Sequence, residues 1–232
     1  MEKIIALLIA GYFIADLALQ AVWMSKCKRN FLFHVLLGLI HAGTAYIAFQ
    51  SWAYWELPLA VFLIHLLINA VKGKDRKTAL ACAVEQSVYL TGITAVVVGL
   101  KIFAGMPDFA GMGFTLIVTV GGFVATVQWA GLFVAKFTKR LIDENNLKLD
   151  IDGLKDGGKW IGRLERALIF AFIFCDYPAG IGFLVAAKSI LRFENARQQK
   201  VAEYVLIGTL MSFALAIALA LLTKWVTTFP TP

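Results

Sequence analysis

The chain has 232 residues, of which 60% are hydrophobic, and its mean hydropathy is +0.77. Soluble domains are nearer to half apolar, whereas here the apolar residues form blocks of about 20, the length that spans a bilayer. This composition excludes a large soluble core. The net charge is +7, and the basic residues cluster in turns between the hydrophobic blocks. We therefore attribute this charge to turns that flank a membrane and not to a nucleic-acid-binding surface.

Hydrophobic segments follow one another along the chain, at residues 4–24, 31–52, 57–71, 79–103, 113–135, 165–187 and 203–226. We predict an all-α, polytopic transmembrane bundle of six to seven membrane segments, in a single integral membrane domain over residues 1–232. The first segment is expected to be a retained helix and not a signal peptide, because Asp16 interrupts it and no small-x-small cleavage site follows.

The charges of the turns predict an orientation. Lys and Arg gather at 25–30, at 72–78 and after residue 135, whereas 50–57 has none and 101–112 has one. The positive-inside rule therefore predicts a membrane protein with its N-terminus outside and a polar cytoplasmic loop at about 136–160. The expected partners are membrane lipids and not nucleic acid, and a homo-oligomer is left open.

The segment 165–187 contains the run Cys175-Asp176-Tyr177-Pro178-Ala179-Gly180, in which proline and glycine can break a helix at membrane depth. If the segment crosses fully, Lys188 and Arg192 lie outside, against the charge rule. If it is a re-entrant pair of half-helices, they stay in the cytoplasm, and both alternatives remain open. Arg163, Glu165 and Arg166 are interpreted as residues of a helix start, the bases at the interface and the acid as a cap. The alternative for the basic residues of this region, Lys188 and Arg192 included, is contact with a lipid headgroup or a phosphate.

Polar side chains recur at one depth on several helices. With a rise of 1.5 Å per residue, five of them lie roughly 10–16 Å from the cytoplasmic turns: Asp16, His41, His65, Glu85 and Gln128. Gln20 and Asn69 share the helix faces of Asp16 and His65, nearer to the turns, and Gln86 follows Glu85. His34, two turns before His41, is expected at the membrane interface. Ionisable groups at such depth are costly unless they meet partners, and they commonly mark functional sites.

Three functions follow from this layer. Imidazole and carboxylate suit zinc, manganese or iron, so Asp16, His41, His65 and Glu85 could bind a divalent metal, with Glu85 as ligand or general base. The leading hypothesis is metal-assisted hydrolysis of a lipid or lipid-linked substrate, with the substrate held by Gln20, Asn69, Gln86, Lys188 and Arg192. The alternatives are an ion, proton or small-solute channel or transporter, and a scaffold without chemistry. Whether the protein is an enzyme is left open.

The runs GRLERALIF, AGIGFLVAAKSILRF and AEYVLIGTLMSF, and more loosely ADLALQ, HLLIN and Glu85-Gln86, resemble the bacterial membrane-protein family catalogued as domain of unknown function 3307. The resemblance covers nearly the whole chain and implies a helical inner-membrane protein, but no particular reaction. The family pattern has histidine where Tyr12 and Tyr89 stand here, and aspartate at Asn69. If the family has a metal site, this chain retains only Asp16, His41, His65 and Glu85 of it, or the site has become a polar core without metal.

Overall fold

The computed structural model of the protein describes residues 2–22, 31–49, 54–71, 79–104, 113–144, 156–193 and 199–228. The regular structure of these residues is helical, which confirms the predicted all-α class. Among them, three helices are long and apolar enough to cross a membrane, Ala79–Ile102, Phe114–Glu144 and Glu203–Thr227. The predicted six to seven crossings are not confirmed, since Val35–Phe49, Glu56–Ile68 and Ala179–Ile190 are shorter apolar helices.

The chain groups into two compact units. Unit 1 comprises Met1–Arg76, Leu80–Val124 and Trp225–Pro232, and unit 2 comprises Lys77–Ala79 and Ala125–Lys224. The helix Phe114–Glu144 contributes residues to both. Whether the units form the single membrane domain expected from the sequence stays a prediction, and each unit is described by itself.

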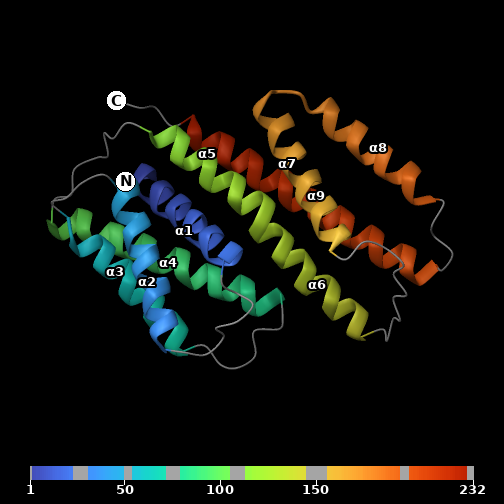
Figure 1. The fold of residues 1–232 in the computed structure, drawn as a ribbon. Coiled ribbons are helices and arrows are strands. Elements are labelled where there is room, and N and C mark those ends of the chain that lie inside the picture. Colours follow the sequence, from blue (N-terminus) through green and yellow to red (C-terminus); the bar gives the residue numbers. More distant parts are fainter. Residues whose placement is uncertain are drawn as a thin grey trace. The chain divides into compact units, whose positions relative to one another are not determined.

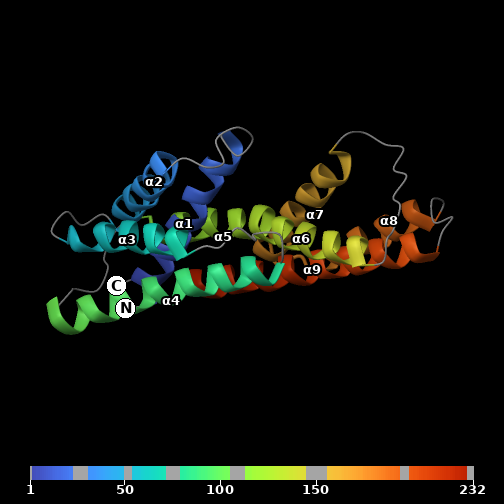
Figure 2. The same cartoon turned by 90° about the horizontal axis from the view of Figure 1, so that it is seen from below.

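Unit 1 is built from the first hydrophobic blocks of the chain. These form α1 (Glu2–Val22), α2 (Phe31–Phe49), α3 (Glu56–Val71), α4 (Ala79–Ala104) and α5 (Phe114–Val124). α1 packs against α2 and α5, and α2 lies alongside α3 (Figures 1 and 2). Their shared core contains Ile4, Leu7, Leu8, Phe49, Leu57, Val61, Ile93, Val97, Phe114 and Val118. This packing fixes the helices that carry most of the predicted polar layer.

Unit 2 follows in the order η1 (Ala125–Trp129, a π-helical turn), α6 (Ala130–Glu144), α7 (Gly157–Phe174), α8 (Ala179–Phe193) and α9 (Gln199–Thr227). Ile169, Phe170 and Ile173 of α7 and Phe213, Ala216 and Ala220 of α9 form its core. Helix extends into the predicted loop 136–160 from both sides, because α6 continues to Glu144 and α7 already begins at Gly157. Residues 145–155 lie outside the described part.

The predicted break in segment 165–187 is a turn between two antiparallel helices, α7 and α8 (Figure 1). Asp176 adopts the left-handed conformation, with φ 55°, and the amide of Tyr177 donates to the carbonyl oxygen of Phe172 at 2.8 Å. Lys224 of α9 donates to the carbonyl oxygen of Ile173 at 2.9 Å and to the carboxylate of Asp176 at 2.5 Å. The turn therefore lies at the level of the C-terminal end of α9, and α8 leads the chain back.

Candidate functional site

The candidate site lies in unit 1, where four helices each contribute polar or aromatic side chains. Tyr12 comes from α1, His41 from α2, His65 from α3, and Gln86 and Tyr89 from α4. We call these five residues the histidine–tyrosine cluster. His41, Gln86 and Tyr89 are buried, with exposed fractions of 2%, 8% and 3%. The packing of the four helices thus buries these polar side chains, although the core of unit 1 around them is largely apolar.

Ring stacking holds the cluster together. The imidazoles of His41 and His65 are stacked, with centroids 4.5 Å apart and planes 27° apart. The ring of Tyr12 lies 5.2 Å from that of His41 and 4.0 Å from that of Tyr89. This close approach of α2 and α3 depends on Gly38, since a Cβ there would lie 2.8 Å from the ring of Phe62 and 3.6 Å from the imidazole of His65.

Hydrogen bonds orient the polar ends of these side chains. The hydroxyl of Tyr12 donates to Oε1 of Gln86 at 3.2 Å. Nδ1 of His41 lies 2.8 Å from the carbonyl oxygen of Leu37. Because a carbonyl only accepts, Nδ1 carries the hydrogen in this contact, and Nε2 is the nitrogen whose protonation can change.

Within the described residues, Nε2 of Gln86 and the hydroxyl of Tyr89 are buried and have no hydrogen-bond partner. Buried polar atoms in proteins are almost always hydrogen-bonded, to protein or to ordered water. Asp16, one turn beyond Tyr12 on α1, is close enough to Tyr89 to act on it electrostatically. These two atoms are therefore the groups of the cluster to which a water molecule could hydrogen-bond.

The structure brings together His41, His65 and Gln86, as the common depth predicted. It does not arrange the predicted ligands as a metal centre. Within the described parts of the chain, which include Asp16, His41, His65 and Glu85, no three His, Cys, Asp or Glu side chains form a group that could hold a metal ion. Equal depth was predicted, but coordination also needs the carboxylates and imidazoles to face one point.

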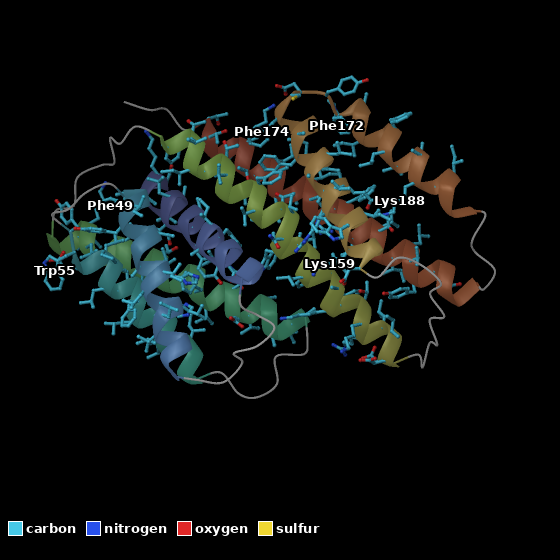
Figure 3. All side chains as sticks on the ribbon, viewed as in Figure 1. Phe49, Trp55, Lys159, Phe172, Phe174 and Lys188 are labelled. Atoms are coloured by element: carbon cyan, nitrogen blue, oxygen red, sulfur yellow. The ribbon has the colours of Figure 1, made fainter. Side chains whose placement is uncertain are left out.

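The other predicted substrate contacts have different outcomes. The side chains of Gln20, Asn69 and Arg192 lie outside the described part of the structure. Lys188 lies on α8 (Figure 3), and its ammonium pairs with the carboxylate of Glu165 at 2.5 Å. Glu165 and Arg166 lie inside α7 and are 7% and 5% exposed, so the interpretation of these residues as part of a helix start was wrong.

Sequence reasoning did not include Tyr12 and Tyr89 in the site. Both carried a signal, because Tyr12 is four residues before Asp16 and Tyr89 is four residues after Glu85, and residues four apart share a helix face. They also stand where the resembled family pattern has histidine. The structure places both rings beside the histidines.

Comparison of the chain with protein-family models, with curated proteins and with solved structures gave no match. The resemblance to domain of unknown function 3307 therefore stays an expectation, and the function must be argued from the geometry of the chain itself.

Proposed function

We propose that the protein moves protons, alone or coupled to a small solute, across the bacterial inner membrane, and that the histidine–tyrosine cluster lies on the proton path. The observation that carries this proposal is the stacking of the buried His41 on His65, with ring centroids 4.5 Å apart. Imidazole is the side chain that changes charge between pH 5 and 8 without special tuning. Two adjacent imidazoles inside a helical membrane protein are therefore suited to accept and release a proton.

The geometry supports transfer of one proton at a time. Two positive charges at this separation repel each other, so a proton on one ring favours the neutral form of the other. The hydroxyls of Tyr12 and Tyr89 and the amide of Gln86 continue the polar row from the imidazoles to α4. A water between the buried hydroxyl of Tyr89 and the amide of Gln86 would give each of them a partner and would extend the path.

Metal-assisted hydrolysis of a lipid, the leading hypothesis from the sequence, ranks second. Catalytic zinc sites usually have three protein ligands and an open position. The described residues bring phenol and amide groups to the two imidazoles, but no group of three His, Cys, Asp or Glu. These neighbours favour hydrogen-bonded proton transfer over coordination.

The membrane topology is part of the proposal. The charge rule supports an external N-terminus, and the antiparallel α7 and α8 support a hairpin that enters and leaves from the cytoplasmic side. Lys188 of α8 contacts Glu165 of α7, so the chain returns to the level at which it entered. The basic residues after α8 then lie in the cytoplasm, which removes the conflict with the charge rule.

The experiment is proton flux into proteoliposomes that contain a trapped pH-sensitive dye, driven by a potassium diffusion potential. We expect His41→Gln and His65→Gln to lower the flux to that of protein-free liposomes, because glutamine can hydrogen-bond but cannot take up a proton. His34→Gln is the matched control, since His34 is the remaining histidine of the sequence and is expected at the interface.

Two results would refute the proposal. One is a wild-type flux no greater than that of protein-free liposomes, over pH 5 to 8. The other is an unchanged flux in both His41→Gln and His65→Gln. Stoichiometric zinc, manganese or iron in the purified protein, lost in His65→Gln but not in His34→Gln, would instead favour the hydrolase.

A further inference from the structure

Unit 2 contains a second polar cluster, formed where the middle of α7 meets its neighbours. Arg163 donates to Oε1 of Gln128 at 3.1 Å. Nε of Arg166 donates to the carbonyl oxygen of Val127 at 3.0 Å, and its Nη1 donates to the hydroxyl of Ser212 at 3.0 Å. Helices η1, α7 and α9 therefore meet at two guanidinium groups, which we call the arginine site together with the Glu165–Lys188 pair.

The backbone around Arg166 is shaped to hold its guanidinium. A π-helical turn interrupts the regular ladder of backbone hydrogen bonds, and such turns occur frequently at functional sites. Val127, whose carbonyl accepts from Arg166, lies in the π-helical turn η1. Four residues on, a Cβ at Gly131 would lie 2.3 Å from Nη2 of Arg166. The guanidinium thus occupies space that only glycine leaves open.

The arginine site carries more positive than negative charge. Arg163, Arg166 and Lys188 are cationic, and Glu165 is the carboxylate among them, so two positive charges are in excess. Glu165 pairs with Lys188 at 2.5 Å, and both side chains are largely buried, 9% and 16% exposed. Among the described residues, no carboxylate forms an ion pair with Arg163 or Arg166. Burial of unpaired charge is costly, so an anion at this site would stabilise the fold.

The neighbourhood favours an anion that carries acyl chains. Large apolar side chains are exposed on α7 and α8 beside the site, namely Trp160, Leu164, Leu168, Phe183 and Ile190, with exposed fractions of 44% to 76%. The guanidinium of Arg163 lies over the ring of Trp160, 5.2 Å from its centroid. Tryptophan is typical of the membrane interface, and arginine binds phosphate through two parallel hydrogen bonds.

The two arginines of the site lie at different depths. Ser212 lies nine residues after Glu203, where the α9 span begins, or roughly 14 Å along the axis. α7 runs in the same direction as α9, because Arg166 contacts Ser212 and Ile173 contacts Lys224. Arg163 is therefore one turn nearer the interface than Arg166, within the reach of a long side chain.

We propose that the arginine site binds the phosphate group of an anionic phospholipid. Arg163 contacts the phosphate directly, Arg166 lies behind it as fixed positive charge, and the Glu165–Lys188 pair holds α8 against α7. The acyl chains lie along the exposed apolar side chains of α7 and α8. This inference concerns unit 2 and does not rest on proton transport by the histidine–tyrosine cluster.

The test is a titration of the purified full chain in detergent, followed by its thermal unfolding temperature. The probes are a short-chain phosphatidylglycerol, the corresponding phosphatidylcholine and inorganic phosphate. We expect phosphatidylglycerol to raise the unfolding temperature at the lowest concentration. Arg163→Gln is expected to weaken this effect about tenfold, the worth of one charge-assisted hydrogen bond, and Arg163→Lys to weaken it less.

Lys159→Gln is the matched control. Lys159 is exposed on the same helix (Figure 3), and its substitution removes the same charge without touching the arginine site, so its titration should match the wild type. Equal responses of wild type and Arg163→Gln would overturn the proposal. It would equally be overturned if inorganic phosphate alone gave the full shift, which would assign the site to a free anion, or if phosphatidylcholine matched phosphatidylglycerol.

Discussion

The contact between α1 and α5 allows a sharp test of the packing in unit 1. Gly121 of α5 is buried against Ala10 of α1, which is 4% exposed and belongs to the core. A Cβ at Gly121 would lie 2.5 Å from both Cα and Cβ of Ala10, and 2.8 Å from its carbonyl oxygen. Small residues at helix contacts allow such close approach of two backbones. The substitution Gly121→Ala therefore probes the separation of the two helices.

The expected magnitude follows from these distances. Carbon atoms pack best at about 3.5–4.0 Å, so α1 and α5 must separate by about 1 Å. Backbone atoms cannot rotate away, and overpacking of this kind costs about 1–3 kcal/mol. Gly99→Ala is the control, because a Cβ at Gly99 meets nothing within 4 Å and alanine favours helix by up to about 1 kcal/mol. We expect the free energies of unfolding of the two variants to differ by about 2–3 kcal/mol.

The assay is unfolding in mixed micelles with increasing dodecyl sulfate, followed by circular dichroism. Gly121→Ala should unfold at a lower dodecyl sulfate fraction than wild type, and Gly99→Ala at the same fraction or a higher one. Ala10 is two residues from Tyr12, so a shift of α1 should also disturb the 3.2 Å hydrogen bond from Tyr12 to Gln86 and lower the proton flux. Coincident unfolding curves for Gly121→Ala and Gly99→Ala would refute the close contact between α1 and α5.

Two further predictions use matched pairs within one unit. Gly131→Ala should destabilise the protein by about 2 kcal/mol, because its Cβ would displace the guanidinium of Arg166, which makes charged hydrogen bonds. Gly158→Ala is the control, since its Cβ meets nothing within 4 Å. Equal unfolding curves for the two variants would contradict this prediction. Tyr89→Phe removes a buried hydroxyl that has no partner among the described residues, so stability should stay or rise while proton flux falls. Tyr54→Phe, in the same unit outside the cluster, should leave the flux unchanged, and a flux retained in Tyr89→Phe would remove that hydroxyl from the path.

The ends of α1 to α4 and of α9 could be predicted because they follow the hydropathy of the sequence. Each of these helices begins and ends within a few residues of a hydrophobic block, as for α2 at Phe31–Phe49 and α3 at Glu56–Val71. The continuation of α6 to Glu144 could not be predicted in this way. The charged run after residue 135 marks a change of surroundings and not the end of a helix, since Lys and Arg favour helix almost as well as leucine. Arg140 and Glu144 also form an ion pair one turn apart at 2.7 Å.

The candidate site was predictable in depth but not in rotation. Counting residues from the basic turns placed His41 and His65 at similar levels, and their rings are indeed stacked. The same count placed Asp16 and Glu85 at that level without specifying the side of the helix on which they face, and no metal-binding group of three is formed among the described residues. Depth depends on sequence position alone, whereas the facing of a side chain depends on the packing of every neighbouring helix.

The arginine site could not be predicted, because it depends on structural features that have no local sequence pattern. A π-helical turn at Ala125–Trp129 has no strong sequence signature, and the start of α7 at Gly157 moved Arg166 from a supposed helix start to mid-helix. At a helix start, an arginine extends to water and costs little. Two turns further in, the same side chain must be buried with its donors satisfied. The position at which α7 begins therefore determines whether Arg166 is an interfacial residue or part of the arginine site.

The α7–α8 hairpin leads to a last prediction, on topology. Glu165 and Lys188 are in contact and the turn between them reaches the level of Lys224, so α8 must end on the side where α7 began. In a cysteine-free background, Asn195→Cys, after α8, and Asn146→Cys, before α7, should react with a membrane-impermeant maleimide from the same side. Glu56→Cys, at the start of α3 and in the stretch 50–57 that has no Lys or Arg, should react from the opposite side. Labelling of Asn195→Cys from the side of Glu56→Cys would mean that the chain crosses the membrane between α7 and α9, and would refute the hairpin as the membrane topology of this segment.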